Sequence, residues 1–147
     1  MANAARFFTE EQKASIKQAI EQAEKNTSGE IRVHVDEKCK GDVVPAAQKV
    51  FAKLGMNHTK ERNGVLFYLA VRDKKFAIIG DQGIHQKVPD GFWDRTRDVM
   101  MDKFKEQKFA EGLCDAIKEA GVQLKLHFPY KDNDRNELSD EVTFDGN

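Results

Sequence analysis

Four oxygen-bearing side chains stand where the apolar segments of this chain begin or end. Glu30 opens one apolar segment, Asn63 precedes the next, Asp81 follows a third, and Asp90 precedes a helical pattern. Glycines flank Asp81, so the backbone there can approach a ligand closely. Because Ca²⁺ and Mg²⁺ take several carboxylate and amide oxygens as ligands, these four residues predict a divalent-cation site with a structural or regulatory role.

Three of these residues also have an ordinary structural interpretation. Asp90 can cap a helix, Glu30 can be a solvated strand end, and Asp81 can occupy a polar turn. The prediction of a cation site therefore depends on whether the fold brings the residues together.

Other acidic residues form a second candidate site. Asp36, Glu37 and Asp73 follow or precede strand-like segments. They are expected at the edge of the sheet opposite Glu30, where an edge means the side of the sheet formed by the ends of its strands. The acidic stretch 132–137 lacks the central glycine and the span of a calcium-binding loop, which indicates an ordinary polar tail.

The motifs of the common enzyme classes are absent from the sequence. It contains no P-loop, GxGxxG, HExxH or GxSxG, so nucleotide binding, zinc proteolysis and serine hydrolysis have no motif to support them. Arg62, beside Asn63, could reach a phosphate. A metal-assisted acid phosphatase that uses Asp81 or Asp90 for acid–base chemistry is therefore an alternative function.

The composition limits the possible partners. The chain has 147 residues, with 24 Lys and Arg against 25 Asp and Glu, so it offers no positive field for nucleic acid or an anionic membrane. No apolar run is long enough for a signal peptide or a membrane span, and a cytoplasmic protein is expected. A third possible function is a non-catalytic interaction module that binds another protein through Trp93 or the acidic tail.

The elements that must position these residues follow from local patterns. Thr9 to Gln12 spells a capping box, and apolar residues at helical spacing follow it. Alternation predicts a strand over 30–36, and a continuous apolar run predicts a central strand over 65–71. A helix over 44–54 separates these strands, a hairpin turn leads to a third strand over 76–79, and two helices follow, one capped by Asp90 and one over 109–126.

These elements predict a three-layer α/β/α sandwich with a small mixed sheet, because a central strand buried on both faces needs cover above and below. A parallel crossover from the first strand to the second would place Glu30, Asn63 and Asp81 at one edge of the sheet and Asp36 and Asp73 at the other. Residues 1–130 are expected to form a single domain, and residues 131–147 a polar, flexible tail.

Five short motifs resemble, in order and spacing, those of the TPM domain family, of the short stand-alone bacterial type. They are residues 28–33 (SGEIRV), 62–66 (RNGVL), 80–84 (GDQGI), Asp90 and residues 109–112. The resemblance implies the three-layer fold and divalent-cation binding, chiefly of calcium. It also implies a contested activity, since plant relatives of the thylakoid lumen are described as acid phosphatases and an animal branch modulates receptors.

The family pattern falls on Glu30, Asn63, Gly64, Gly80, Gly83 and Asp90. Asp81 lies inside the Gly-x-x-Gly turn, where the family often has another residue.

Overall fold

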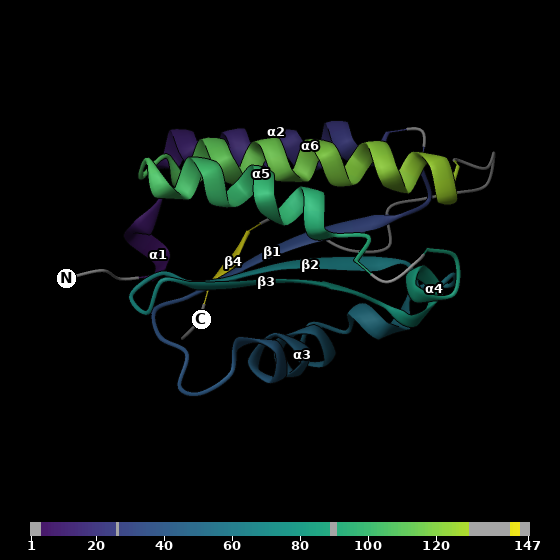
Figure 1. Ribbon diagram of the computed structural model, residues 1–147, viewed down its shortest axis with the longest axis horizontal. Coiled ribbons are helices and arrows are strands. Elements are labelled where there is room, and N and C mark those ends of the chain that lie inside the picture. The colour runs from purple at the N-terminus through teal and green to yellow at the C-terminus, as the bar shows by residue number, and fades with distance from the viewer. Residues whose placement is uncertain (1–3, 26, 89–90, 130–141, 145–147) are drawn as a thin grey trace.

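The computed structural model describes residues 4–25, 27–88, 91–129 and 142–144 (Figure 1). The element order along the chain is α1 (Ala4–Phe7), α2 (Glu10–Glu24), β1 (Glu30–Asp36), α3 (Val43–Lys53), η1 (Met56–His58), β2 (Gly64–Ala70), β3 (Lys75–Gly80), α4 (Gln82–His85), α5 (Asp94–Lys105), α6 (Phe109–His127) and β4 (Thr143–Phe144).

The sheet is mixed, with strand order β3-β2-β1-β4. β1 runs parallel to β2, and β2 and β3 form an antiparallel hairpin, which confirms the predicted crossover and hairpin. β4 extends the sheet beyond β1 in parallel. Sequence reasoning did not predict β4, because two residues in a polar stretch are too short for any periodicity to be read.

All seven residues of β2 are buried, because helices cover both faces of the strand. α2, α5 and α6 lie over one face and α3 lies over the other (Figure 1). Side chains alternate along a strand, so Val65, Phe67 and Leu69 join the core under α6, while Leu66 and Tyr68 join the smaller core against α3. The predicted three-layer α/β/α architecture is confirmed.

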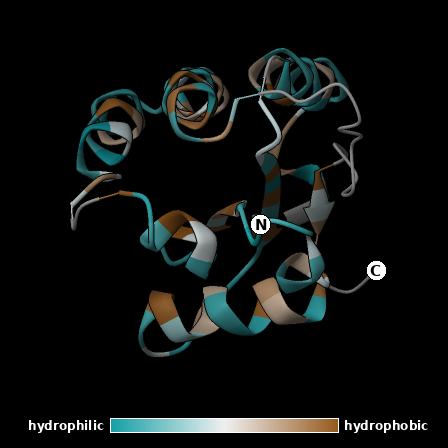
Figure 2. Cartoon of the chain, turned by 90° about the vertical axis from the view of Figure 1, so that its right-hand side faces the viewer, coloured by the Kyte–Doolittle hydropathy of each residue, from teal (hydrophilic) through white to brown (hydrophobic). Residues whose placement is uncertain are grey.

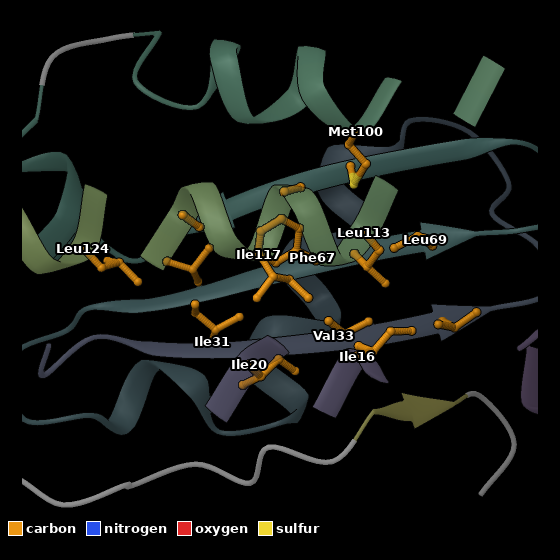
Figure 3. Close-up of a cluster of buried hydrophobic side chains, with 14 of the residues drawn as sticks. Ile16, Ile20, Ile31, Val33, Phe67, Leu69, Met100, Leu113, Ile117 and Leu124 are labelled. Atoms are coloured by element: carbon orange, nitrogen blue, oxygen red, sulfur yellow. The ribbon is translucent and has the colours of Figure 1, made fainter. Parts of the chain in front are cut away.

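The larger core is built from branched aliphatic side chains of β1, α2 and α6. Figure 3 shows Ile16 and Ile20 of α2 beside Ile31 and Val33 of β1, with Ile117 of α6 near the centre of the cluster. Burial of such side chains provides the main free energy that holds these layers together. In Figure 2 each helical layer carries both brown and teal stretches, as expected of helices with one buried face.

The capping box at the start of α2 is present as predicted. Thr9 N–H donates to Gln12 Oε1 over 2.9 Å, and Gln12 N–H donates to Thr9 Oγ1 over 3.0 Å. These two bonds satisfy amides that have no partner within the helix.

The predicted cap of α5 is wrong. The helix begins at Asp94, and its N-cap residue is Trp93, which makes no side-chain capping bond. Asp90 precedes this start by four positions in the sequence and lies outside the described residues. Trp93 is partly buried against the larger core, with its ring 4.7 Å from that of Phe92 between centroids.

Within the described ranges, no helix is long and apolar enough to cross a membrane. Most of the predicted tail, residues 131–141 and 145–147, lies outside those ranges.

Candidate functional site

Strand register brings Glu30, Asn63 and Asp81 to one edge of the sheet, as predicted. Glu30 is the register partner of Gly64, the residue after Asn63. Glu30 N–H donates to the Asn63 carbonyl over 3.3 Å, and Asp81 N–H donates to the Gly64 carbonyl over 2.9 Å. The fourth predicted residue, Asp90, is outside the described residues.

Asn63 is 1% exposed and lies in a polar network. Its Nδ2 donates to Ser28 Oγ over 3.2 Å, and the Ser28 hydroxyl in turn donates to Glu61 Oε2. Because the Ser28 hydroxyl donates its only proton to Glu61, it can only accept a hydrogen bond from Asn63. The NH₂ end of the Asn63 amide, rather than its oxygen, therefore faces Ser28. Asn63 Oδ1 is then buried without a hydrogen-bond partner among the residues that the structure describes.

Glu30 is the most buried carboxylate at this edge, with 2% of the residue exposed. Alternation along β1 places its side chain on the face that α3 partly covers, since Ile31 belongs to the core on the other face. A carboxylate this deeply buried is stabilised as an anion only by hydrogen bonds or a nearby positive charge. Arg32 lies two residues along the same strand face, and burial lowers the pKa of its guanidinium.

Asp81 and Arg62 form a bidentate ion pair. Arg62 Nε lies 2.8 Å from Asp81 Oδ2, and Arg62 Nη2 lies 3.1 Å from Oδ1. The hydrogen bonds to Asp81 raise the pKa of Arg62. Asp81 also accepts the Gln82 N–H over 2.7 Å and caps α4. Arg62 and the Gln82 N–H together take three of the roughly four acceptor positions of this carboxylate.

Gly83 lets the 59–63 loop lie directly against α4. A Cβ added at Gly83 would stand 2.1 Å from the Glu61 carbonyl oxygen and 2.5 Å from that of Arg62. The Gly83 N–H donates to the Arg62 carbonyl over 2.9 Å. Only glycine permits this approach, so the glycine of the Gly-x-x-Gly turn positions Arg62 and Asn63.

The second candidate site, at the opposite edge, is occupied by internal partners. Asp36 Oδ1 lies 2.7 Å from His34 Nε2, and Asp36 Oδ2 accepts the Tyr68 hydroxyl over 2.6 Å. Burial opposes ionisation of Asp36, but the bonds from His34 and then Tyr68 lower its pKa. Burial and the contact with Asp36 raise the pKa of Tyr68.

The other two acids of this edge also have structural partners. Glu37 pairs with Arg72 over 3.0 Å, and Asp73 accepts the Cys39 N–H over 2.7 Å. Asp73 therefore fixes the turn of the hairpin against the loop that follows β1. Across the part of the chain that the structure describes, no group of three or more His, Cys, Asp or Glu residues is arranged to hold a metal ion.

The family model of the TPM domain matches residues 1–123. The chain belongs to the TPM domain family. Among solved structures, the NMR structure of BA42 protein from the psychrophilic bacterium Bizionia argentinensis is similar to it at 47% sequence identity, with a TM-score of 0.89, and the match covers 94% of this chain and 95% of BA42.

More distant TPM-like folds are also known. The N-terminal domain of cg2496 protein from Corynebacterium glutamicum matches with a TM-score of 0.64 at 15% identity, covering 80% of this chain and 74% of that domain. The N-terminal domain of a protein from P. gingivalis matches with a TM-score of 0.66 at 18% identity, covering 84% and 83%. At these identities the likeness concerns the fold alone. No curated protein matches the chain.

Glu61 is not among the predicted site residues, and Ser28 is named only as part of the family motif 28–33. Ser28 contacts Asn63 across 35 positions of sequence and Glu61 across 33. No local pattern reports such contacts.

Proposed function

We propose that this TPM domain binds a divalent cation, Ca²⁺ or Mg²⁺, at the sheet edge that contains Glu30 and Asn63, in a structural or regulatory role. The observation that supports the proposal best is the buried Asn63 Oδ1, which has no hydrogen-bond partner in the described part of the chain. An orphaned carbonyl oxygen in the interior costs about 1–3 kcal/mol. A hard cation would supply the missing partner.

The residues present fit such an ion in part. Asn63 and Glu30 offer an amide and a carboxylate oxygen that are both nearly inaccessible to water, and Glu61 adds a carboxylate next to Ser28. Asp81 of the predicted set is paired with Arg62, which leaves its carboxylate fewer free lone pairs for an ion. Asp90 stays a predicted ligand.

A bound cation would supply positive charge where three connections meet. These are residues 27–29 before β1, residues 59–63 before β2, and residues 80–83 between β3 and α4. The loops already contact one another through Ser28, Arg62 and Gly83. Binding would therefore favour the native arrangement of this edge rather than create a new fold.

We do not propose a phosphatase reaction, because no observation favours it. Arg62, the residue considered for phosphate binding, directs two guanidinium nitrogens to Asp81. An interaction through Trp93 has no support either, because that side chain packs against the core.

The test is thermal unfolding of metal-stripped protein with Ca²⁺ or Mg²⁺ added. A ligand that binds only the native state at a hundred times its Kd stabilises it by about 2.7 kcal/mol, which raises Tm by about 5–10 °C for a chain of this size. The same titration is made with Asn63→Ala, which we expect to lose most of the cation response. Unchanged melting of the unaltered protein at millimolar Ca²⁺ and Mg²⁺ contradicts the proposal.

Asn57→Ala is a matched control. Asn57 Oδ1 is also a buried amide oxygen without a partner in the described residues, but it lies in η1 rather than in the polar network of Asn63. We expect Asn57→Ala to keep the full cation response. If Asn57→Ala loses the response and Asn63→Ala keeps it, the cation site is not the one proposed.

A further inference from the structure

A pocket of about 570 Å³ lies at the edge of the sheet opposite Asn63. It is formed where β2 ends and β3 begins, and α1, the end of α5 and the start of α6 complete its walls. Figure 1 shows α1 beside this edge of the sheet and α4 at the opposite edge. The pocket size falls in the range of small-molecule sites.

Aromatic rings form much of the wall of this pocket. Phe7, Phe76, Phe104 and Phe109 come from four different elements and all line it. Phe104 lies 5.5 Å from Phe76 and 5.1 Å from Phe109 between ring centroids, and Phe7 lies 5.3 Å from Phe109. Two of these pairs are T-shaped and one is tilted, and aromatic rings prefer such arrangements over a face-to-face sandwich.

The charged residues of the pocket are all positive. Among the described residues, Lys74, Lys75 and Lys105 line it, and no Asp or Glu does. Lys75 Nζ already donates to the carbonyls of Cys39 and Gly41 over 3.2 and 2.7 Å. Lys74 and Lys105 are exposed and make no ion pair within the described residues.

We infer that this pocket binds a small aromatic anion of the aryl carboxylate class. The ring packs against the phenylalanine walls, and the carboxylate faces Lys74 and Lys105. The charge of the lysines complements such a ligand, whereas a neutral ring would use only the apolar walls. The inference does not depend on the proposed cation site, which lies at the other edge.

The test is a two-dimensional NMR titration with 1-naphthoate, at constant ionic strength and with a chelator present to exclude cation effects. We expect saturable amide shifts centred on Ala70, Lys74, Met101 and Gln107. We also expect intermolecular NOEs from the naphthoate ring to the Phe104 ring protons. This measurement uses the unaltered protein. Shifts that do not saturate, or that centre elsewhere, overturn the inference.

Two matched comparisons test the role of charge. The neutral analogue 1-naphthalenemethanol, and the double variant Lys74→Gln/Lys105→Gln with 1-naphthoate, should each bind about three- to tenfold more weakly, as expected from two exposed charge contacts. The control Lys118→Gln/Lys125→Gln changes the net charge equally on exposed residues of α6 and should bind 1-naphthoate as the unaltered protein does. Equal binding of the neutral analogue, or equal weakening in both double variants, contradicts the inference.

Discussion

Asp36, at the end of β1, gains its stability as an anion from neighbours on two strands. His34 on β1 and Tyr68 on β2 both bond its carboxylate, and Asp36→Asn should destabilise the fold by about 1.5–3 kcal/mol near neutral pH, as for hydrogen bonds to a charged group. The control Asp42→Asn alters an exposed N-cap residue that makes no side-chain capping bond, and it should cost much less. Urea unfolding measures both.

The stability contributed by Asp36 should also depend on pH. Because its pKa is lower in the folded protein than in the unfolded chain, the contribution is fully present above the unfolded value of about 3.9 and is lost as pH falls through the folded value. The difference in unfolding free energy between the unaltered protein and Asp36→Asn should therefore shrink below about pH 4. A difference that stays constant from neutral to strongly acidic pH would show that the carboxylate is not stabilised as an anion.

Gly83 should not tolerate a methyl group. Alanine favours helices over glycine by about 1 kcal/mol, yet a Cβ here would overlap the Glu61 carbonyl oxygen. We expect Gly83→Ala to lose about 1–3 kcal/mol of unfolding free energy by overpacking, while the exposed neighbour in Gln82→Ala changes little. Chemical denaturation distinguishes the two, and a stabilised Gly83→Ala variant would mean that the 59–63 loop does not lie against α4.

The residue types of the candidate site could be predicted from the sequence, but their partners could not. Glu30, Asn63 and Asp81 mark strand ends, which is a local pattern. The pairing of Arg62 with Asp81 spans 19 positions and depends on the register of β2 and β3, so only the folded chain reveals that Asp81 is already engaged.

At the scale of the elements, the Thr143 side chain adds two contacts to the pairing of β4 with β1. Thr143 Oγ1 donates to the Val33 carbonyl over 3.2 Å and lies 2.7 Å from His34 Nδ1. Thr143→Val keeps the shape and the β-branching but loses both bonds, and we expect a loss of about 1–2 kcal/mol in unfolding free energy. Thr143→Ser keeps the hydroxyl and should retain most of the stability. Equal stability of the valine and serine variants would show that the hydroxyl does not hold the strand.

Elements with strong local signals were predicted well, and those without were not. The capping box of Thr9 and the apolar run of β2 are encoded within a few residues. β4 pairs with β1 across more than a hundred positions, and the start of α5 at Asp94 follows a turn that lacks a capping side chain. In both places tertiary contacts, rather than propensity, determine the structure.

At the scale of the whole molecule, the layer order followed from the burial pattern. A strand that is apolar on both faces requires two helical layers, and β2 receives them from α6 and its neighbours on one side and α3 on the other. The two edges of the sheet differ in character: one holds the polar network around Asn63, and the other holds the aromatic pocket with its lysines.

The central claim is that the edge around Asn63 binds a divalent cation, and a two-dimensional NMR titration of metal-free protein with Ca²⁺ and then Mg²⁺ tests it most directly. The account predicts saturable shifts at the amides of Glu30, Gly64, Asp81, Gly83 and Asp90, with little change at Asp36 and Asp73. Shifts centred on Asp36 and Asp73, or no saturable shift at any amide, would contradict it.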